Sequence, residues 1–503
     1  MVIPQVLNEA GRDAAQHTAV VFGEKSVSYV ELDAAATAIA AGLARKLGIR
    51  PGDRVALMCP NSDAFVCAAY GIMRSGAAVV PINVMFKADE TAYVLQDAEP
   101  KALLAWRDCL PTVRQALEHL AQPPPVVAIG AEQEALSLEG LAKSDAAGFA
   151  PPALAEDDVA AILYTSGTTG RCKGAMLTHR NLLSNASAGV EAVEVTAEDR
   201  VACVLPMFHS FGLTVGIIIP LVARGSTVAI PRFSPGLLLS AVSQTKPTLL
   251  PLVPAMYAAL LHHPAERKRE ALLSVRMCIS GGDALPVELL QRFEEQFGAK
   301  IYEGYGPTEC SPIVSVNRPS GVRKVGSVGP PLPGVQVRIV DDDRRPLPLG
   351  EIGEVAVRGD NVMKGYWRRP EETAEVLSEG WYYSGDLGRM DEDGYLYIVD
   401  RKRDMIIVGG LNVYPAEVEQ VLLRHPAVQE AAVVGLRGQL RGEVVVAFVV
   451  LREGAEASEL DLIQHCRASL AAFKVPKTVR FVPELPKSTT GKVLKHVLRS
   501  AEQ

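Results

Sequence analysis

Short apolar and β-branched runs alternate with helical patterns from residue 1 to about residue 399. Residues 55–58 and 78–81 have the composition of strands, and residues 63–73 between them repeat apolar positions at helical spacing. We expect further strands at residues 159–164, 201–205 and 227–230. Strands that alternate with helices predict largely parallel sheets covered by helices, so this part of the chain is expected to be α/β.

The longest apolar stretch, residues 213–223, belongs to a helix expected over residues 211–222. It has about half of the roughly 20 apolar residues that a membrane-spanning helix needs. His209 and Arg224 lie on either side of it. We therefore predict a buried helix and no integral membrane segment.

The pattern changes after about residue 320. Strands separated by Gly, Pro and Asp turns are expected at residues 334–340, 353–358 and 394–399, which is typical of a small antiparallel β-subdomain. A dense charged cluster, residues 400–404, follows. We place the domain boundary there, between an N-terminal domain of residues 1–399 and a C-terminal domain of residues 400–503.

The C-terminal domain is predicted to be a compact α+β unit. Pro415 followed by Glu417 is typical of a helix start, and Ser458 with Asp461 resembles a capping box. The expected elements are a helix from Pro415, strands at residues 428–434 and 444–450, and a helix from Ser458 to Leu470. The predicted fold is thus a large domain of layered α/β sheets with a β-subdomain, followed by a small α+β domain.

Composition and charge narrow the functional classes. The 503 residues carry a formal charge of -7 and no long Lys/Arg run, so no nucleic-acid partner is expected. The eight cysteines are scattered without a C-x-x-C pair or a metal-ligand spacing with His, which predicts reduced thiols. The N-terminus lacks the regions of a signal peptide, so we expect a cytoplasmic enzyme.

The strongest local signal for chemistry is the segment YTSGTTGRCKG at residues 164–174, which follows an apolar strand. Its glycines let backbone N–H groups approach phosphate oxygens, its hydroxyls donate hydrogen bonds, and Lys173 supplies a positive charge. A flexible surface turn is the alternative. The P-loop spacing is absent because Gly174, rather than Ser or Thr, follows Lys173, and this disfavours kinases and NTPases of that class.

With this segment the chain resembles the adenylate-forming superfamily, which includes acyl-CoA synthetases, luciferases and the adenylation domains of peptide synthetases. Further matches follow in the family's order over nearly the whole chain. They are residues 206–212, 280–285, 303–309, 353–359, 383–386, 400–401 with 409–410, and 486–492. Any one match alone would be weak, whereas their common order is specific.

The resemblance implies an ATP site and a metal site. The residues it assigns to ATP are Thr165, Ser166, Gly167, Thr168, Thr169, Gly170, Lys173, Gly281, Gly282, Glu303, Gly304, Tyr305, Thr308, Asp386, Arg401 and Lys492. An aromatic ring such as Tyr305 can stack on adenine, and Asp386 can accept hydrogen bonds from the ribose hydroxyls. Glu309, with Thr165, would hold Mg²⁺, which prefers hard oxygen ligands. Taken singly, such residues could equally be turn formers.

The resemblance also assigns catalytic residues. Lys492, in a Ser/Thr/Gly-rich loop, would bridge the carboxylate of the substrate and the α-phosphate of ATP, stabilising the charge that develops as they react. Glu309 would act through the metal ion. His209 would be a gate between the adenylate and the thiol channel.

The implied reaction has two steps that need different surroundings. A carboxylate is a poor acyl donor, so ATP first converts it to an acyl-AMP, and the thiol of CoA then displaces AMP. Asp400 corresponds to the hinge about which the small domain rotates between the steps. Gly409 and Gly410 correspond to the loop that then lines the CoA channel. The expected ligands are therefore ATP, Mg²⁺, CoA and a small carboxylic acid.

The acid is expected to be a fatty or similar apolar acid. Residues 303–317 most resemble the bacterial fatty-acid-CoA ligases, and the candidate pocket segments carry no second carboxylate clamp. These segments are residues 211–220, 252–256 and 310–316. An aryl or cinnamoyl acid is the nearest alternative.

Two other classes are disfavoured. An enzyme that loads an amino acid onto a carrier protein would place an Asp near Phe208 and His209, and none is present. A degenerate nucleotide sensor would not need Lys492, Glu309 and Asp386 together. The chain departs from the family at Cys172, where a proline is common, and at residues 436–438, which replace a common Val-Pro-Asp before a Gly-Glu pair.

Overall fold

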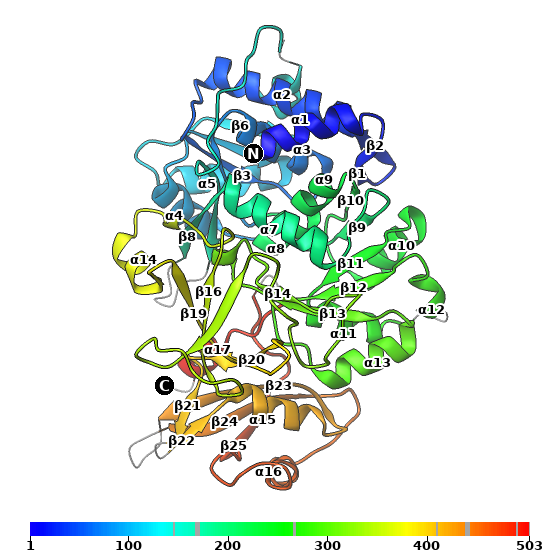
Figure 1. The fold of residues 1–503 in the computed structure, drawn as a ribbon, viewed down its shortest axis with the longest axis vertical. Helices are drawn as coiled ribbons and strands as arrows, with labels where there is room; N and C mark the ends of the chain where they lie inside the picture. The colour runs from blue at the N-terminus through cyan, green and yellow to red at the C-terminus, as the bar shows by residue number, and fades with distance from the viewer. Residues whose placement is uncertain are drawn as a thin grey trace.

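A computed structural model describes residues 1–143, 146–165, 172–264, 268–408, 411–437, 443–488 and 491–501. Three large sheets are formed by strands that end at or before Arg401, and smaller sheets follow (Figure 1). The elements after residue 404, drawn in orange and red, gather at one end of the molecule. The predicted fold class, an α/β chain with a smaller C-terminal unit, is confirmed.

The largest sheet has eight strands and is parallel except at its two edges. In spatial order its strands are β14 (Ser315–Val316), β13 (Ile301–Tyr305), β12 (Met277–Ser280), β11 (Leu249–Leu252), β9 (Arg200–Cys203), β10 (Ser226–Ala229), β1 (Thr18–Phe22) and β2 (Lys25–Ser28). Leu252, Ser280 and Glu303 are register neighbours at the carboxyl ends of β11, β12 and β13. The loops after these strands therefore leave the sheet side by side, where ligands of open α/β sheets bind.

A second sheet has seven strands. In spatial order they are β17 (Gly365–Tyr366), β8 (Lys173–Thr178), β7 (Val159–Thr165), β4 (Ala78–Pro81), β3 (Arg54–Met58), β5 (Ala102–Trp106) and β6 (Val126–Ile129). The last five are parallel, whereas β8 is antiparallel to β7 and to β17. Buried Val and Leu side chains fill both faces of its central strands, as expected for parallel strands between helices.

The third sheet is antiparallel. It consists of β15 (Gln336–Val340), β16 (Gly353–Arg358), β19 (Trp381–Met390), β18 (Leu377–Ser378) and β20 (Leu396–Arg401). This is the predicted β-subdomain. Arg401 is still paired with Asp386 of β19, so the predicted boundary at residue 400 falls inside a strand, and the domain limits remain a prediction.

Helices cover the first two sheets. They are α1 (Ile3–Asp13), α2 (Tyr29–Leu47), α3 (Asp63–Arg74), α4 (Ala88–Ala98), α5 (Leu110–Leu117), α6 (Leu138–Ala142), α7 (His179–Ala192), α8 (Ser210–Leu213), α9 (Ile219–Ala223), α10 (Pro235–Thr245), α11 (Pro254–His262), α12 (Lys268–Ala271) and α13 (Val287–Phe297), with α14 (Pro370–Val376) beside β17. The caps follow local chemistry, as in α2, where Ser28 and Glu31 form a capping box and Gly48 ends the helix at φ +62°.

The predicted buried helix at residues 211–222 is confirmed as buried but is not a uniform α-helix. A π-helical segment, Thr214–Ile218, lies between α8 and α9. Pro220 has no N–H to donate to residue 216, and a Cβ on Gly216 would lie 2.2 Å from the Cys203 sulfur. The close approach to β9 requires glycine there.

The C-terminal elements have cores of their own. They are β21 (Ile406–Val408), β22 (Leu411–Val413), α15 (Pro415–Leu423), β23 (Val428–Arg437), β24 (Glu443–Leu451), α16 (Glu459–Arg467), β25 (Thr478–Phe481) and α17 (Lys495–Ser500). Two buried clusters pack on β23 and β24, and all their described members come from residues after 400. The predicted Ser458–Asp461 capping box is present, although its helix ends at Arg467 rather than Leu470.

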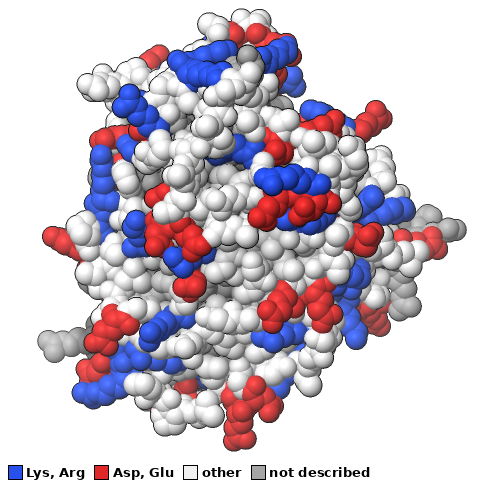
Figure 2. All heavy atoms as spheres, turned by 45° about the horizontal axis from the view of Figure 1, so that its top comes forward, with Lys and Arg blue, Asp and Glu red and all other residues white. Residues whose placement is uncertain are grey.

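Acidic and basic side chains intermingle on the face drawn in Figure 2. Exposed ion pairs of the protein include Arg180 with Glu156 and Asp157. Among the described residues, no helix is both long and apolar enough to cross a membrane.

Candidate functional site

The glycine-rich segment connects two antiparallel strands. Thr165 ends β7, Lys173 begins β8, and the two residues face each other in the ladder. A P-loop would lead from a strand into a helix, so the two antiparallel strands here differ from that motif. Of the predicted ATP residues, Ser166, Gly167, Thr168, Thr169 and Gly170 lie outside the described residues.

Gly281 and Gly282 follow β12 where the predicted adenine face would lie. A Cβ on Gly281 would lie 3.2 Å from the ring of Phe211 and 3.4 Å from the carbonyl oxygen of Gly304. Gly282 has φ +82°, which side chains other than glycine rarely adopt. These glycines bring the loop close to the end of β13, next to Tyr305.

Glu303, in β13, is hydrogen-bonded to the backbone that follows this loop. Its side chain is 8% exposed, and its carboxylate accepts backbone hydrogen bonds from Leu285 and Gly326. Burial raises the pKa of Glu303 to about 7, although these hydrogen bonds and Arg323 oppose the rise. Glu303 therefore ties the segment after Gly282 to the segment that contains Gly326.

Tyr305, Asp386 and Arg401 form a connected group across three strands. The Tyr305 hydroxyl donates to Asp386 Oδ2 at 2.6 Å, and Arg401 Nε lies 3.2 Å from Asp386 Oδ1. Asp386 is only 6% exposed, so the charge of Arg401 compensates for its burial. Three residues far apart in the sequence thus meet, and their assignment to ribose and adenine stays a prediction.

Thr308 and Glu309 lie in a short 3₁₀ turn, Thr308–Cys310, just beyond β13. The Thr308 and Ser210 hydroxyl oxygens are 2.9 Å apart. Glu309 is 8% exposed, and its Oε1 accepts a hydrogen bond from the Tyr366 hydroxyl at 2.8 Å. Within the described residues no hydrogen bond or ion pair engages Glu309 Oε2, which leaves a hard oxygen for a cation.

His209 precedes α8 as its N-cap. Its Nδ1 accepts a hydrogen bond from the Phe211 N–H at 3.3 Å. Burial lowers the pKa of His209 to about 4, so the imidazole is neutral near pH 7.

Asn61 holds the loop that leads to His209, and sequence reasoning did not identify it. Its amide donates to the carbonyls of Cys203, Leu205 and Ile230 at 3.0, 2.8 and 3.1 Å, and its oxygen accepts from the Met207 N–H at 2.8 Å. The neighbouring Ser62 has a local role, because its side chain accepts from the Phe65 N–H at the start of α3.

Lys492 reaches this region from the C-terminal part of the chain. The charges of Asp283, Asp386 and Arg401 act on its ammonium group, and burial followed by Arg401 lowers its pKa. Its loop closes through a hydrogen bond from Ser488 N–H to the Lys492 carbonyl at 2.7 Å. A Cβ on the neighbouring Gly491 would lie 3.2 Å from Ala255 Cβ of α11. The lysine loop therefore packs directly against the large domain.

Asp400 lies at the junction of the two parts. Its Oδ1 accepts from the Arg401 N–H at 2.7 Å and its Oδ2 from the Ala416 N–H at 2.9 Å, at the start of α15. Burial raises the pKa of Asp400, while Lys495 opposes the rise. The predicted channel glycines, Gly409 and Gly410, lie outside the described residues.

Two of the candidate acid-pocket segments meet over α7. The Cδ1 atoms of Ile219 and Ile313 would lie 2.9 and 3.4 Å from a Cβ on Gly189. Among the described residues, no cluster of three or more His, Cys, Asp or Glu side chains is arranged to hold a metal ion. A metal there would need oxygens of ATP or water beside Glu309.

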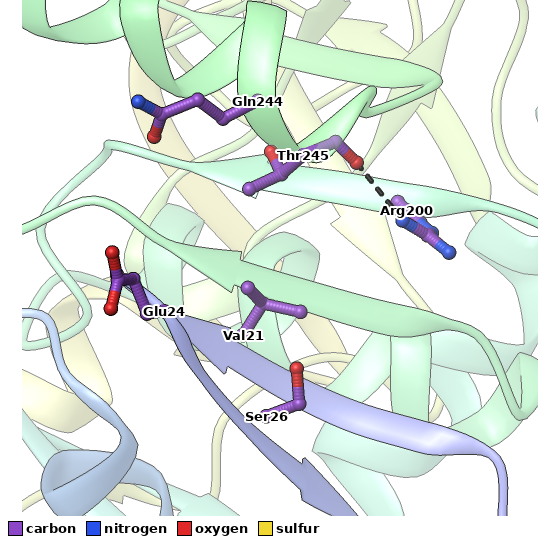
Figure 3. A pocket seen from close by; sticks show the side chains of 7 residues that line it. Val21, Glu24, Ser26, Arg200, Gln244 and Thr245 are labelled. Atoms are coloured by element: carbon purple, nitrogen blue, oxygen red, sulfur yellow. Dashed lines mark hydrogen bonds between the residues drawn. The ribbon is translucent and has the colours of Figure 1, made fainter.

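An open hollow of about 420 Å³ lies elsewhere, between the β1–β2 hairpin, β9 and α10. Figure 3 shows its lining residues, with Arg200 donating to the Thr245 carbonyl at 3.0 Å. It contains none of the residues predicted for ATP, metal or catalysis.

Comparison with known proteins identifies related enzymes. The family of AMP-binding enzymes matches residues 7–367, and the AMP-binding enzyme C-terminal domain matches residues 417–492. A long-chain-fatty-acid-CoA ligase of Bacillus subtilis (strain 168) is 38% identical over 99% of this chain and 94% of its own length. A feruloyl-CoA synthase of Amycolatopsis sp is 39% identical over 96% of this chain and 95% of its own length.

Solved structures agree with these matches. The ATP-bound MatB of Rhodopseudomonas palustris has a TM-score of 0.92 and 36% identity, covering 100% of this chain and 99% of that one. The anthranilate CoA ligase AuaEII, in complex with anthranoyl-AMP, has a TM-score of 0.93 and 32% identity, covering 100% and 97%.

Proposed function

This chain belongs to the AMP-binding enzyme family, and we propose from that premise that it joins a fatty acid to CoA through an acyl-AMP. Its membership makes it an AMP-forming acyl-CoA ligase that uses ATP and CoA. The identity of the acid, the metal ion and the roles of individual residues are proposed here in addition. The cytoplasmic location expected from the sequence also remains a prediction.

In the first step a carboxylate oxygen of the acid attacks the α-phosphorus of ATP, and pyrophosphate leaves. The ammonium of Lys492 stabilises the negative charge that the carboxylate and α-phosphate bring together. Thr308 donates to the α-phosphate, and Tyr305 packs against adenine. Asp386 holds the ribose hydroxyls, with Arg401 beside it at 3.2 Å.

Mg²⁺ would be held by Glu309, with Thr165 at the end of β7 as its second protein ligand. The buried Glu309 carboxylate fits the ion, because Oε1 is fixed by Tyr366 and the ion prefers oxygen ligands. When bound, Mg²⁺ would neutralise charge on the phosphates of ATP. Lys173 would add a further positive charge from the adjacent strand.

In the second step the sulfur of CoA attacks the acyl carbon, the thiol loses its proton, and AMP leaves. His209 would gate the passage between the thiol and the acyl-AMP, and its neutral ring can move without carrying a charge. Rotation at Asp400 would withdraw Lys492 and bring Gly409 and Gly410 to the CoA channel.

The placement of Lys492 is the observation that carries this proposal. A lysine close to the C-terminus lies where the charges of Asp386, Arg401 and Asp283, which follows β12, act on it. We propose that the carboxylate oxygen of the acid and the α-phosphate of ATP meet at this ammonium group, which would stabilise their combined charge.

The test is to incubate the protein with ATP, Mg²⁺ and a panel of straight-chain, aromatic and amino acids, with and without CoA. We expect fatty acids to yield AMP and acyl-CoA by mass spectrometry. Lys492→Ala should lose adenylate formation by at least about 100-fold, since it removes the charge that stabilises the transition state. Lys487→Ala is the matched control. It removes another lysine of the same loop, which is paired with Glu430 of β23.

An aryl or cinnamoyl acid is the second candidate. It is favoured by the 39% identity to a feruloyl-CoA synthase over 96% of this chain. The same panel decides between the two, because preferential turnover of aromatic acids would replace the fatty-acid proposal. Adenylates that CoA never accepts would instead indicate a carrier protein as acceptor.

A further inference from the structure

Tyr366 contacts two residues assigned to different parts of the proposed site. Its hydroxyl donates to Glu309 Oε1 at 2.8 Å, and the Nζ of Lys173 lies 5.4 Å from the centre of its ring. Tyr366 is 8% exposed, as is Glu309, so both groups are shielded from water that could replace the hydrogen bond. One buried side chain thus contacts both Lys173, at the start of β8, and the Glu309 carboxylate, the proposed metal ligand.

The backbone around Tyr366 is hydrogen-bonded to β8, the strand that begins with Lys173. Tyr366 pairs with Ala175 of β8, and the Trp367 N–H donates to the Gly174 carbonyl at 2.7 Å. The Tyr366 N–H itself donates to Thr373 Oγ1 at 2.9 Å. The ring therefore has a fixed position relative to Lys173.

The same segment is attached to the turn that carries Glu309. The Met363 N–H donates to the Glu309 carbonyl at 2.7 Å, and Asn361 Nδ2 donates to the Cys310 carbonyl at 3.0 Å. These bonds fix the backbone of Glu309 and do not engage its carboxylate. The Tyr366 hydroxyl supplies the missing constraint, because it engages one carboxylate oxygen and leaves the other for a cation.

We propose that Tyr366 is a positioning residue for the metal ion, whose hydroxyl orients the Glu309 carboxylate while its ring locates Lys173 beside the phosphates. The inference rests on the proposed role of Glu309. Hydrogen-bond partners of metal-binding carboxylates commonly set how tightly the metal is held. A phenylalanine would keep the ring under Lys173 and lose only the hydroxyl, so the two contributions can be separated.

The experiment uses the full-length protein with a non-cleavable α,β-methylene analogue of ATP and Mn²⁺ as the metal probe. Free Mn²⁺ is measured by electron paramagnetic resonance. We expect Tyr366→Phe to weaken Mn²⁺ binding in the complex about tenfold. The Mg²⁺ concentration for half-maximal ATP–pyrophosphate exchange should rise by a similar factor, with the rate recovering at saturating Mg²⁺ and the KM for ATP little changed.

Tyr383→Phe is the matched control. Its phenol is 6% exposed, lies on β19 and accepts a hydrogen bond from Arg338 at 3.1 Å. We expect Mn²⁺ affinity in this variant to match that of the wild type. If Tyr366→Phe changes only the unfolding temperature, or if Tyr383→Phe weakens Mn²⁺ binding equally, the inference is overturned.

A third variant separates this inference from the proposed function. If Glu309→Gln binds Mn²⁺ as the wild type does, the proposed metal role of Glu309 is wrong. If Glu309→Gln loses the metal while Tyr366→Phe keeps it, only the positioning role of Tyr366 fails.

Discussion

Two buried carboxylates of β13 and the turn after it experience different surroundings. Glu309 accepts a hydrogen bond from a tyrosine and is the proposed ligand of a cation, whereas Glu303 accepts backbone hydrogen bonds from Leu285 and Gly326. Burial raises the pKa of Glu303 to about 7. At the scale of residues, a carboxyl group beside the site thus titrates in the neutral range and has a structural effect.

The sign of that effect is predictable. The pKa of Glu303 in the folded protein, about 7, lies above its ordinary value of 4.5, so between these pH values the folded state holds a proton that the unfolded state releases. The free energy of unfolding therefore falls as pH rises through this window, by up to about 3 kcal/mol. Glu303→Gln should flatten the fall, as measured by apparent unfolding temperatures at several pH values between 4.5 and 7.5.

The exposed Glu392→Gln is the control and should keep the wild-type dependence on pH. Equal slopes for the wild type and Glu303→Gln would show that Glu303 is already ionised at pH 5. That result would contradict the prediction.

At the scale of elements, Asn61 connects the end of β3 to the loop between β9 and α8. Asn61→Ala leaves three carbonyls and one N–H without their side-chain partner. We expect the free energy of unfolding to fall by about 3 kcal/mol. A buried group left unpaired costs roughly 1–3 kcal/mol, but the Cys203 carbonyl keeps the Ile230 N–H as a partner and other groups will recruit water. Chemical denaturation would measure the loss, and the ligation rate should fall because the loop carries His209.

Tyr29→Phe serves as the comparison for that variant. The Tyr29 hydroxyl donates to the carbonyls of Pro220 and Gly225. These lie in α9 and just after it, at the other end of the helical segment that begins with α8. This variant should lose stability without slowing ligation below its unfolding temperature. If Asn61→Ala is as stable as the wild type, the hydrogen bonds of Asn61 do not stabilise this loop and the prediction is wrong.

Elements with strong local patterns were predictable from the sequence. The bounds of β4 and β16, Ala78–Pro81 and Gly353–Arg358, agree with the predicted strands because short apolar or alternating runs lie between turn residues there. The π-helical segment was not predictable, since it depends on the contact between Gly216 and Cys203 in another element.

The site depended on long-range contacts that no local pattern encodes. Tyr305 and Asp386 are 81 residues apart, and only the resemblance to a family suggested that they serve one site. Tyr366 was missed because its strand is two residues long, too short to show a period. The sequence therefore predicted residue types suited to ATP, whereas the hydrogen bonds that orient them required the structure.

At the scale of the whole molecule, the lysine loop packs against the large domain. A Cβ at Gly491 would lie 3.2 Å from Ala255 Cβ, slightly less than the roughly 3.5–4.5 Å between the two Cβ atoms of a disulfide. We expect Ala255→Cys with Gly491→Cys to cross-link on oxidation, with some loss of stability because Gly491 has φ +83°, which residues with a side chain rarely adopt. The oxidised protein should still form acyl-AMP but lose transfer to CoA, as followed by mass spectrometry.

Reduction should restore the transfer step, and each single cysteine variant should behave alike with and without oxidant. Normal acyl-CoA formation by the cross-linked protein would refute rotation at Asp400 as a requirement for the second step.

The proposed site is assembled from residues that range from Thr165 to Lys492 along the chain. A molecule in which only one region has reached its native arrangement therefore has an incomplete site. We expect such a molecule to be inactive and not merely slower. Chains of this size commonly pass through partly ordered intermediates during refolding, and those intermediates would be enzymatically silent. Recovered ligase activity would thus count fully native molecules, while spectroscopic signals would register the intermediates as well.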